Sequence, residues 1–290
     1  LSSSSAASDV YKRQGLMRGA PRTFTIFVGL YLVFLYAPVL LLPIFAFNDS
    51  AIIAFPLRGF TLDWFIGLAS ETTLIVSVQN SLLVAIVAAV LSTCLGVLAS
   101  RASARFDYPG KKPIMSFLML PLVLPEIIVG VSLLIVLVQL GVSLNVWTVI
   151  LGHVLICMPF SIAILLSAFN NMDRNLEEAS LDLGANRRET FFKIILPLVM
   201  PGIISSLLIS FTISLDEFII AFFLTGTDTT LPVYIWSQLR FPSKLPGVMA
   251  LGFIMLILSL ILLTAGEYFR KKSARLASTE TTLNKDADHG

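Results

Sequence analysis

Three acidic residues lie inside stretches of the sequence that are otherwise apolar. Glu126 follows two prolines in MLPLVLPEIIVG, and Asp216 and Glu217 are adjacent in SLDEFIIAFF. A carboxylate at mid-membrane costs about 2.5–3.5 kcal/mol, so such a residue faces a protein interior or a water-filled path. Two interpretations follow: the acids line a path that attracts cations, or Asp216 and Glu217 bond neighbouring helices and Glu126 is hydrated at a span end.

The sequence offers little material for catalysis or for metal binding. It holds two histidines, and its two cysteines, Cys94 and Cys157, both lie in apolar runs, which argues against a zinc site and a disulfide framework. The phosphate-binding pattern G-x-x-x-x-G-K-[ST] is absent, and no nucleophile–base set is evident. We expect a protein that is not an enzyme, with no metal or cofactor of its own.

The elements that would position these acids are membrane-spanning helices. Of the 290 residues 56% are hydrophobic and 13% are charged, whereas a soluble domain carries about 25% charged residues. A net charge of +2 is too small to suggest nucleic-acid binding. A bilayer needs about 20 apolar residues in a helix. An all-α polytopic membrane protein with six transmembrane helices is predicted, over Phe24–Phe47, Thr73–Ser100, Pro113–Leu140, Trp147–Asn170, Leu198–Leu224 and Leu245–Phe269.

Basic residues predict the orientation of these spans. With six spans, 17 of the 20 Lys and Arg residues fall on one side, so both termini are expected in the cytoplasm. On the other side, the segment from Asn48 to Thr72 is rich in aromatic residues. It is interpreted either as an interfacial segment along the outer membrane face or as a plain packed loop.

Two features inside the spans predict how the helices pack and break. Span two carries small residues four positions apart, a spacing that lets helix backbones approach closely. We expect a packing seam at Ala88, Ser92, Gly96 and Ser100. Pro121 and Pro125 each lack a backbone donor and should kink or break span three.

The stretch after span four, residues 175–202, predicts two short helices joined by a turn. Asn175 and Asn186 are expected to cap them, with a glutamate three residues after each, and Gly184 suits the left-handed stop between them. Two prolines should end the second helix and open span five. Each helix carries an apolar stripe that would dock a partner or pack on the chain's own helices: Leu176, Ala179 and Leu183, then Phe191, Ile194 and Ile195; the prolines are Pro197 and Pro201.

This stretch resembles the signature EAA-x3-G-x9-I-x-LP of ATP-binding-cassette importer permeases. The matching residues are Glu178, Ala179, Ser180, Gly184, Ile194, Leu196 and Pro197. The one departure is Ser180, where the pattern prefers Ala. The segments FAFNDS at 45–50, QNSLLVA at 79–85 and the run at 214–240 are similar to the spermidine/putrescine (polyamine) permease subfamily.

The resemblance implies a role and a set of partners. The loop at residues 170–197 would be the cytoplasmic coupling-helix loop that docks on a dimer of ATP-binding subunits, which would bind ATP and Mg. A second homologous permease subunit and a periplasmic or extracytoplasmic solute-binding protein would complete an importer in the lipid bilayer of a bacterial cytoplasmic (inner) membrane. The expected cargo is putrescine or spermidine, and Glu126, Asp216 and Glu217 would suit a cation path.

Alternatives stay open on the sequence alone. Related permeases carry iron, thiamine, phosphonate or sulfate. An ion-coupled secondary transporter would also use membrane acids, but no internal repeat typical of that class is evident. Residues 1–16, rich in Ser and Ala, are interpreted as a non-native leader, 17–270 as the transmembrane permease domain, and 271–290 as a polar cytoplasmic tail.

Overall fold

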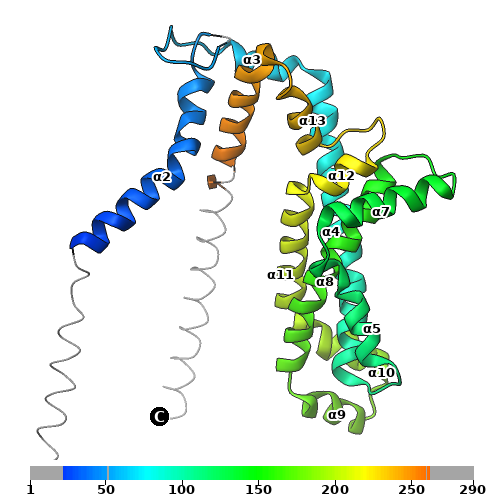
Figure 1. Cartoon of the computed structure of the whole chain (residues 1–290). Coiled ribbons are helices and arrows are strands. Elements are labelled where there is room, and N and C mark those ends of the chain that lie inside the picture. Colours follow the sequence, from blue (N-terminus) through cyan, green and yellow to red (C-terminus); the bar gives the residue numbers. More distant parts are fainter. Residues whose placement is uncertain (1–21, 51, 259, 262–290) are drawn as a thin grey trace, which may run out of the picture. The chain divides into compact units, whose positions relative to one another are not determined.

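The computed structural model describes residues 22–50, 52–258 and 260–261, which form two compact units (Figure 1). The first unit combines the residues up to Leu68 with those from Phe241 onward, and the second spans Ala69–Arg240. The leader and the tail predicted at the two ends lie outside the described residues. The helices are α2 (Arg22–Ala46), α3 (Asp63–Ser70), α4 (Thr72–Arg105), α5 (Lys111–Leu118), α6 (Leu120–Val123), α7 (Glu126–Gln139), α8 (Val146–Asn171), α9 (Arg174–Asp182), α10 (Arg187–Thr190), the π-helix η1 (Phe191–Ile195), α11 (Leu196–Asp216), α12 (Ile219–Leu224), α13 (Leu231–Gln238) and the 3-10 helix η2 (Pro242–Lys244).

The predicted helical class is confirmed for the described residues, whose one β feature is an isolated bridge between Asn48 and Phe60. Helices long and apolar enough to cross a membrane are Thr23–Ala46, Thr72–Arg105, Val146–Asn171 and Arg187–Asp216. Glu126–Gln139 and Pro242–Leu258 are shorter apolar helices. The described helices therefore provide four such spans where the sequence predicts six. Predicted span three is divided into shorter helices, and predicted span six extends beyond the described residues.

The second unit is a bundle of α4, α8 and α11, and small residues let its helices approach. The four residues of the predicted seam on α4 are all buried. Gly96 faces Ser161 of α8, and the Ser100 hydroxyl donates to the carbonyl of Ile162 at 3.0 Å. The predicted packing seam is thus confirmed as the contact between α4 and α8.

Buried hydroxyl groups also connect α11 to both neighbouring helices. Ser206, Ser210 and Ser214 recur every four residues and are all buried. Their oxygens lie 3.0 Å from Thr93 of α4, 2.9 Å from Ser161 of α8 and 2.7 Å from Nδ1 of His153 of α8. Hydrogen bonds between helices in an apolar medium stabilise their association modestly but give it a fixed register.

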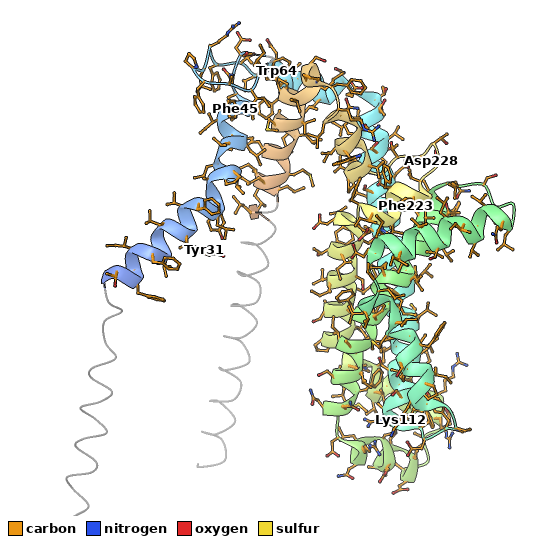
Figure 2. The ribbon with its side chains drawn as sticks, viewed as in Figure 1. Tyr31, Phe45, Trp64, Lys112, Phe223 and Asp228 are labelled. Atoms are coloured by element: carbon orange, nitrogen blue, oxygen red, sulfur yellow. The ribbon has the colours of Figure 1, made fainter. Side chains whose placement is uncertain are left out.

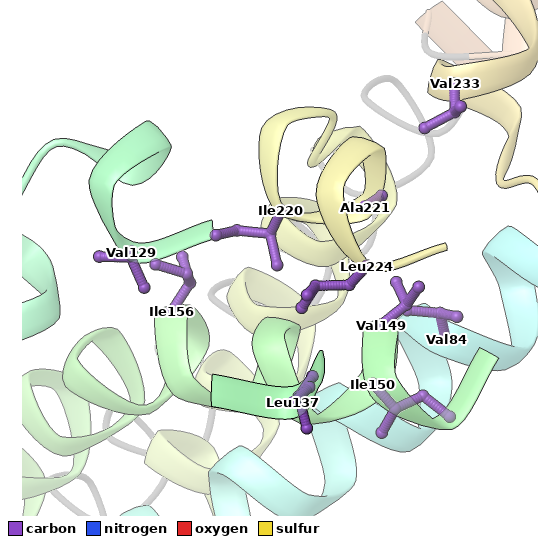
Figure 3. Close-up of a cluster of buried hydrophobic side chains, with 10 residues drawn as sticks. All are labelled: Val84, Val129, Leu137, Val149, Ile150, Ile156, Ile220, Ala221, Leu224 and Val233. Atoms are coloured by element: carbon purple, nitrogen blue, oxygen red, sulfur yellow. The ribbon is translucent and has the colours of Figure 1, made fainter. Parts of the chain in front are cut away.

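The predicted break in span three is confirmed between α6 and α7. Leu124 and Pro125 have extended backbone there, and Pro125 precedes the first residue of α7, where its missing N–H removes no helical bond. Beyond the break, α7 packs on α12, and Val129 of α7 joins Ile220 and Ile156 in a buried apolar cluster (Figure 3). The broken helix is held by this cluster.

The structure corrects both ends of predicted span five. The prolines Pro197 and Pro201 do not separate the loop from the span, because one helix runs continuously from Arg187 to Asp216. It is wound as a π-helix before Pro197, where the Leu196 amide donates to the Phe191 carbonyl five residues earlier. The wider π turn adds a residue to the helix and places Pro197 at the start of α11.

The other correction is that the helix ends at Asp216 instead of continuing to Leu224. Glu217 has an extended backbone, and α12 begins two residues later. The Glu217 carboxylate accepts a hydrogen bond from the Ile220 amide at 3.0 Å and so caps a free donor of α12. This hydrogen bond stabilises the break, and no proline or glycine marks the break in the sequence.

In the first unit, the aromatic segment after α2 folds on itself. The Phe47 ring lies 5.2 Å from that of Phe60 and 4.9 Å from that of Phe65. Asn48 is buried, and its carbonyl accepts from the indole of Trp64 at 3.0 Å (Trp64 is labelled in Figure 2). The segment thus has internal contacts and includes α3, while Phe55 and Phe60 stay exposed, and its position along a membrane face stays a prediction.

Gly96→Val should destabilise the bundle. A Cβ at this position would lie 2.8 Å from Cβ and 3.2 Å from the carbonyl carbon of Ser161. Overpacking of this kind costs about 1–3 kcal/mol. We expect a lower midpoint of thermal unfolding in detergent. Gly29→Val in α2 is the matched control, because it makes the same helix substitution with nothing within 4 Å. Equal midpoints of thermal unfolding for the two variants would contradict close helix packing at the seam.

Candidate functional site: an ion-paired loop and three acids

The loop that carries the motif is a helix–turn–helix of α9 and α10. The predicted cap Asn186 is confirmed: its side chain accepts from the Glu189 amide at 2.9 Å, and Glu189 accepts from the Asn186 amide at 3.1 Å. Gly184 has the predicted left-handed backbone, with φ of +89°. The predicted cap Asn175 is wrong. α9 begins earlier, because the Asp173 carboxylate accepts from the Asn175 amide at 3.0 Å.

Glu177 fastens α9 to the end of α4. Its carboxylate lies 3.3 Å from Nε of Arg105 and 3.8 Å from Nη2 of Arg101. The Arg105 side chain is only 7% exposed, so its charge depends on this partner. Two further bonds support the contact: Arg105 donates to the Met172 carbonyl at 3.2 Å, and Arg174 donates to the Ala104 carbonyl at 2.9 Å.

Two other contacts join the parts of the loop. The Arg101 guanidinium lies 4.3 Å from the centre of the Phe191 ring and so links α4 to η1. The hydroxyls of Ser180 and Thr190 are 3.0 Å apart and buried, which links α9 to α10. Ser180 is the one departure from the motif, and this bond is one that alanine could not make.

Only one of the two predicted apolar stripes is open to a partner. On α9, Leu176 is 45% and Leu183 is 89% exposed, and Ala179 and Glu178 are exposed beside them. The stripe of the second helix instead turns inward, because Ile195 is buried against core residues of α8. Among the other motif residues, Ile194 and Leu196 are half-buried and Pro197 is exposed. We call the exposed stripe of the first helix the α9 face: Leu176, Ala179 and Leu183.

The three predicted pathway acids lie where helices are interrupted, and they differ in exposure. Glu126 is exposed at the first residue of α7, and Asp216 is exposed at the last residue of α11. Glu217 is 8% exposed and caps α12. Glu126 and Asp216 are therefore exposed, whereas Glu217 forms a structural hydrogen bond, and a role for these acids in a solute path stays a prediction.

The sequence did not reveal the ion-paired cluster of Glu177, Arg101 and Arg105. The two arginines were counted only as topology signals, and Glu177 stands beside the motif glutamate without belonging to the motif. Their contacts join positions about 70 residues apart, which no local pattern reveals. Among the described residues, no group of three or more His, Cys, Asp or Glu side chains is arranged to hold a metal ion.

Residues 92–275 match the family described as the binding-protein-dependent transport system inner membrane component, and the chain belongs to that family. It is thus a multi-pass membrane component of a transport system that works with a solute-binding protein. The matched region includes the end of α4 from residue 92 onward, the loop and all three acids.

Two curated relatives have named substrates. The chain is 34% identical over 248 residues to the spermidine/putrescine transport system permease protein PotC of Haemophilus influenzae, a match that covers 85% of this chain and 96% of the relative. It is 36% identical over 232 residues to the putrescine transport system permease protein PotI of Escherichia coli, covering 77% and 82%.

Solved structures share the fold. A chain of a bacterial ABC transporter involved in the import of the acidic polysaccharide alginate aligns with a TM-score of 0.67 at 14% identity, covering 84% of this chain and 94% of that chain. A second alginate transporter structure, in complex with a pentasaccharide-bound periplasmic protein, aligns with a TM-score of 0.65 at 19% identity, covering 89% and 94%.

Glu177→Gln should loosen α9, whereas Glu178→Gln should not. The two residues are adjacent and the substitution is the same, but of these two glutamates Glu177 alone has an ion-pair partner among the described residues. Breaking this partly buried pair should cost roughly 1–3 kcal/mol, between the values for exposed and buried pairs. We expect roughly tenfold faster amide hydrogen exchange in α9 for Glu177→Gln. Unchanged exchange in Glu177→Gln would show that the ion pair does not hold the loop.

Proposed function

We propose that this chain is a membrane-spanning permease subunit of a bacterial ABC importer for polyamines such as putrescine and spermidine. The observation that carries the proposal is the pairing of an anchored loop with an open α9 face and two exposed acids in an apolar bundle. Identity of 34–36% to relatives named for spermidine and putrescine, over most of this chain, supports the cargo.

The proposed topology has six transmembrane helices with both termini in the cytoplasm of the bacterium. The distribution of basic residues supports it: Arg101, Arg105, Arg174 and Arg187 gather at the loop, which would lie on the cytoplasmic side. Asp216 ends the continuous helix that leaves the loop. Its carboxylate would then lie toward the outer half of the bilayer, where a cation enters.

The α9 face would dock on one of two ATP-binding subunits, which bind ATP and Mg. Motion of that subunit would reach the membrane through the helix from Arg187 to Asp216, whose 30 residues span about 45 Å. A second homologous permease subunit would complete the path, and an extracytoplasmic solute-binding protein would deliver the polyamine. This chain's role is to bind, orient and release the cation, while the partners perform the chemistry.

Leu183→Glu should abolish co-purification of the ATP-binding subunit. Leu183 is 89% exposed, so its replacement should leave the midpoint of thermal unfolding unchanged. A buried charge at the docking surface should weaken binding by at least about a hundredfold. Lys112→Glu, an exposed position of α5 outside the loop, controls for added negative charge. If the subunit co-purifies with Leu183→Glu as with the parent, docking on the α9 face is wrong.

Asp216→Asn and Glu126→Gln should each lower ATP-dependent uptake of labelled putrescine and spermidine. The assay uses vesicles that hold the assembled importer and its binding protein. Each variant removes one carboxylate that would attract a cation, and we expect roughly a tenfold loss. Asp228→Asn, an exposed acid in the loop after α12, should transport normally.

The same vesicles test the alternatives. ATP-dependent uptake of thiamine, iron, phosphonate or sulfate in place of polyamine would keep the importer and discard the cargo. Polyamine uptake that needs an ion gradient, without a co-purifying ATPase, would reject the importer in favour of a secondary transporter.

A further inference from the structure

A cavity of about 200 Å³ opens where the end of α4 meets α9 and α10. Four arginines line it, Arg101 and Arg105 from α4, Arg174 from α9 and Arg187 from α10, together with Glu177 and Glu178. Its position behind α9 separates it from the α9 face, since none of the three residues of that face lines the cavity. The cavity is therefore a distinct feature of the loop.

Positive charge in this cavity exceeds negative charge. Four guanidinium groups and two carboxylates line the cavity. One of these carboxylates, Glu177, already forms ion pairs with both Arg101 and Arg105. Within the described residues, neither Arg174 nor Arg187 forms an ion pair. The hydrogen bond found there for the Arg174 side chain is to the neutral carbonyl of Ala104. Arg101 also experiences the charges of Arg105 and Arg187. An anion between them would relieve this repulsion.

Two of the arginines that line the cavity are held in place by their surroundings. The Nε atoms of Arg101 and Arg105 are buried and form no hydrogen bond in the described part of the chain, although Arg105 Nε lies 3.3 Å from Glu177. The Arg101 guanidinium is held over the Phe191 ring at 4.3 Å, which fixes its plane. A planar guanidinium presents its N–H groups as a fork that fits two phosphate oxygens at once.

We propose that this cavity binds a phosphate group, presented either by the headgroup of an anionic phospholipid or by a free phosphate compound. Arg101 of α4 and Arg187 of α10 bind the phosphate oxygens, and the anion joins the end of a long apolar helix to the loop. A phosphate in this position bridges two elements, α4 and α10, and so it stiffens the loop that the ion pair of Glu177 already holds.

The test measures binding to the purified full-length chain by native mass spectrometry and by the rise in thermal unfolding midpoint. The probes are nanodiscs of phosphatidylglycerol, nanodiscs of phosphatidylcholine, and inorganic phosphate. Arg187→Gln should weaken phosphate or phosphatidylglycerol binding at least about tenfold. Arg187→Lys, which keeps the charge but loses the fork, should show an intermediate loss. Arg188→Gln is the matched control, because its guanidinium lies outside the cavity, 6.0 Å from the Phe192 ring.

The choice of probes distinguishes a lipid headgroup from a free phosphate compound. Stabilisation by phosphatidylglycerol that inorganic phosphate does not displace assigns a lipid headgroup, and displacement by phosphate assigns a free phosphate compound. Equal losses in Arg187→Gln and Arg188→Gln, or no stabilisation of the parent by any anionic probe, would overturn the site. Loss of the ATP-binding subunit from Arg187→Gln, with anion binding intact, would likewise overturn it and assign the arginines to a carboxylate of that partner. Because anion binding is measured on the chain alone, this result is independent of polyamine transport.

Discussion

The loop of α9 and α10 depends on one interaction, the ion pair of Glu177 with the arginines at the end of α4. Arg105 is almost fully buried there, and a buried cation without a partner is costly. The pair therefore fixes α9 against α4, and this contact keeps Leu183 and the rest of the α9 face exposed. The same two arginines also line a cavity together with Arg174 and Arg187.

The bundle also contains interrupted helices. Their form follows from the requirement that backbone polar groups be hydrogen-bonded in an apolar medium. Pro125 interrupts one helix by lacking a donor, and Glu217 interrupts the other by capping α12. Each interruption leaves an exposed acid beside it, Glu126 in the first case and Asp216 in the second. The capping carboxylate Glu217 is thus buried, while its neighbour Asp216 is exposed.

The fold does not select the cargo. Chains with TM-scores of 0.67 and 0.65 to this one come from transporters of alginate, an acidic polysaccharide, whereas the relatives with 34–36% identity are named for polyamines. A bundle of apolar helices gives the same scaffold to either kind of solute. A shared fold therefore does not identify the solute, which depends on the side chains that the scaffold carries.

The sequence by itself determined the helical class, the packing seam on α4, the break at Pro125, the cap at Asn186 and the family motif. Each of these depends on residue type and short spacing, and those act over one or two helical turns. Only the tertiary structure decided that Glu177 holds the loop while Glu178 stays free, that Ser180 bonds Thr190, and that the helix stops at Asp216. It also turned the second apolar stripe inward and moved the cap of α9 to Asp173. The ion pair and the buried stripe depend on partners brought together by helix packing. The caps and the stop depend on which of several available hydrogen bonds the folded backbone adopts, a competition that the sequence pattern does not resolve.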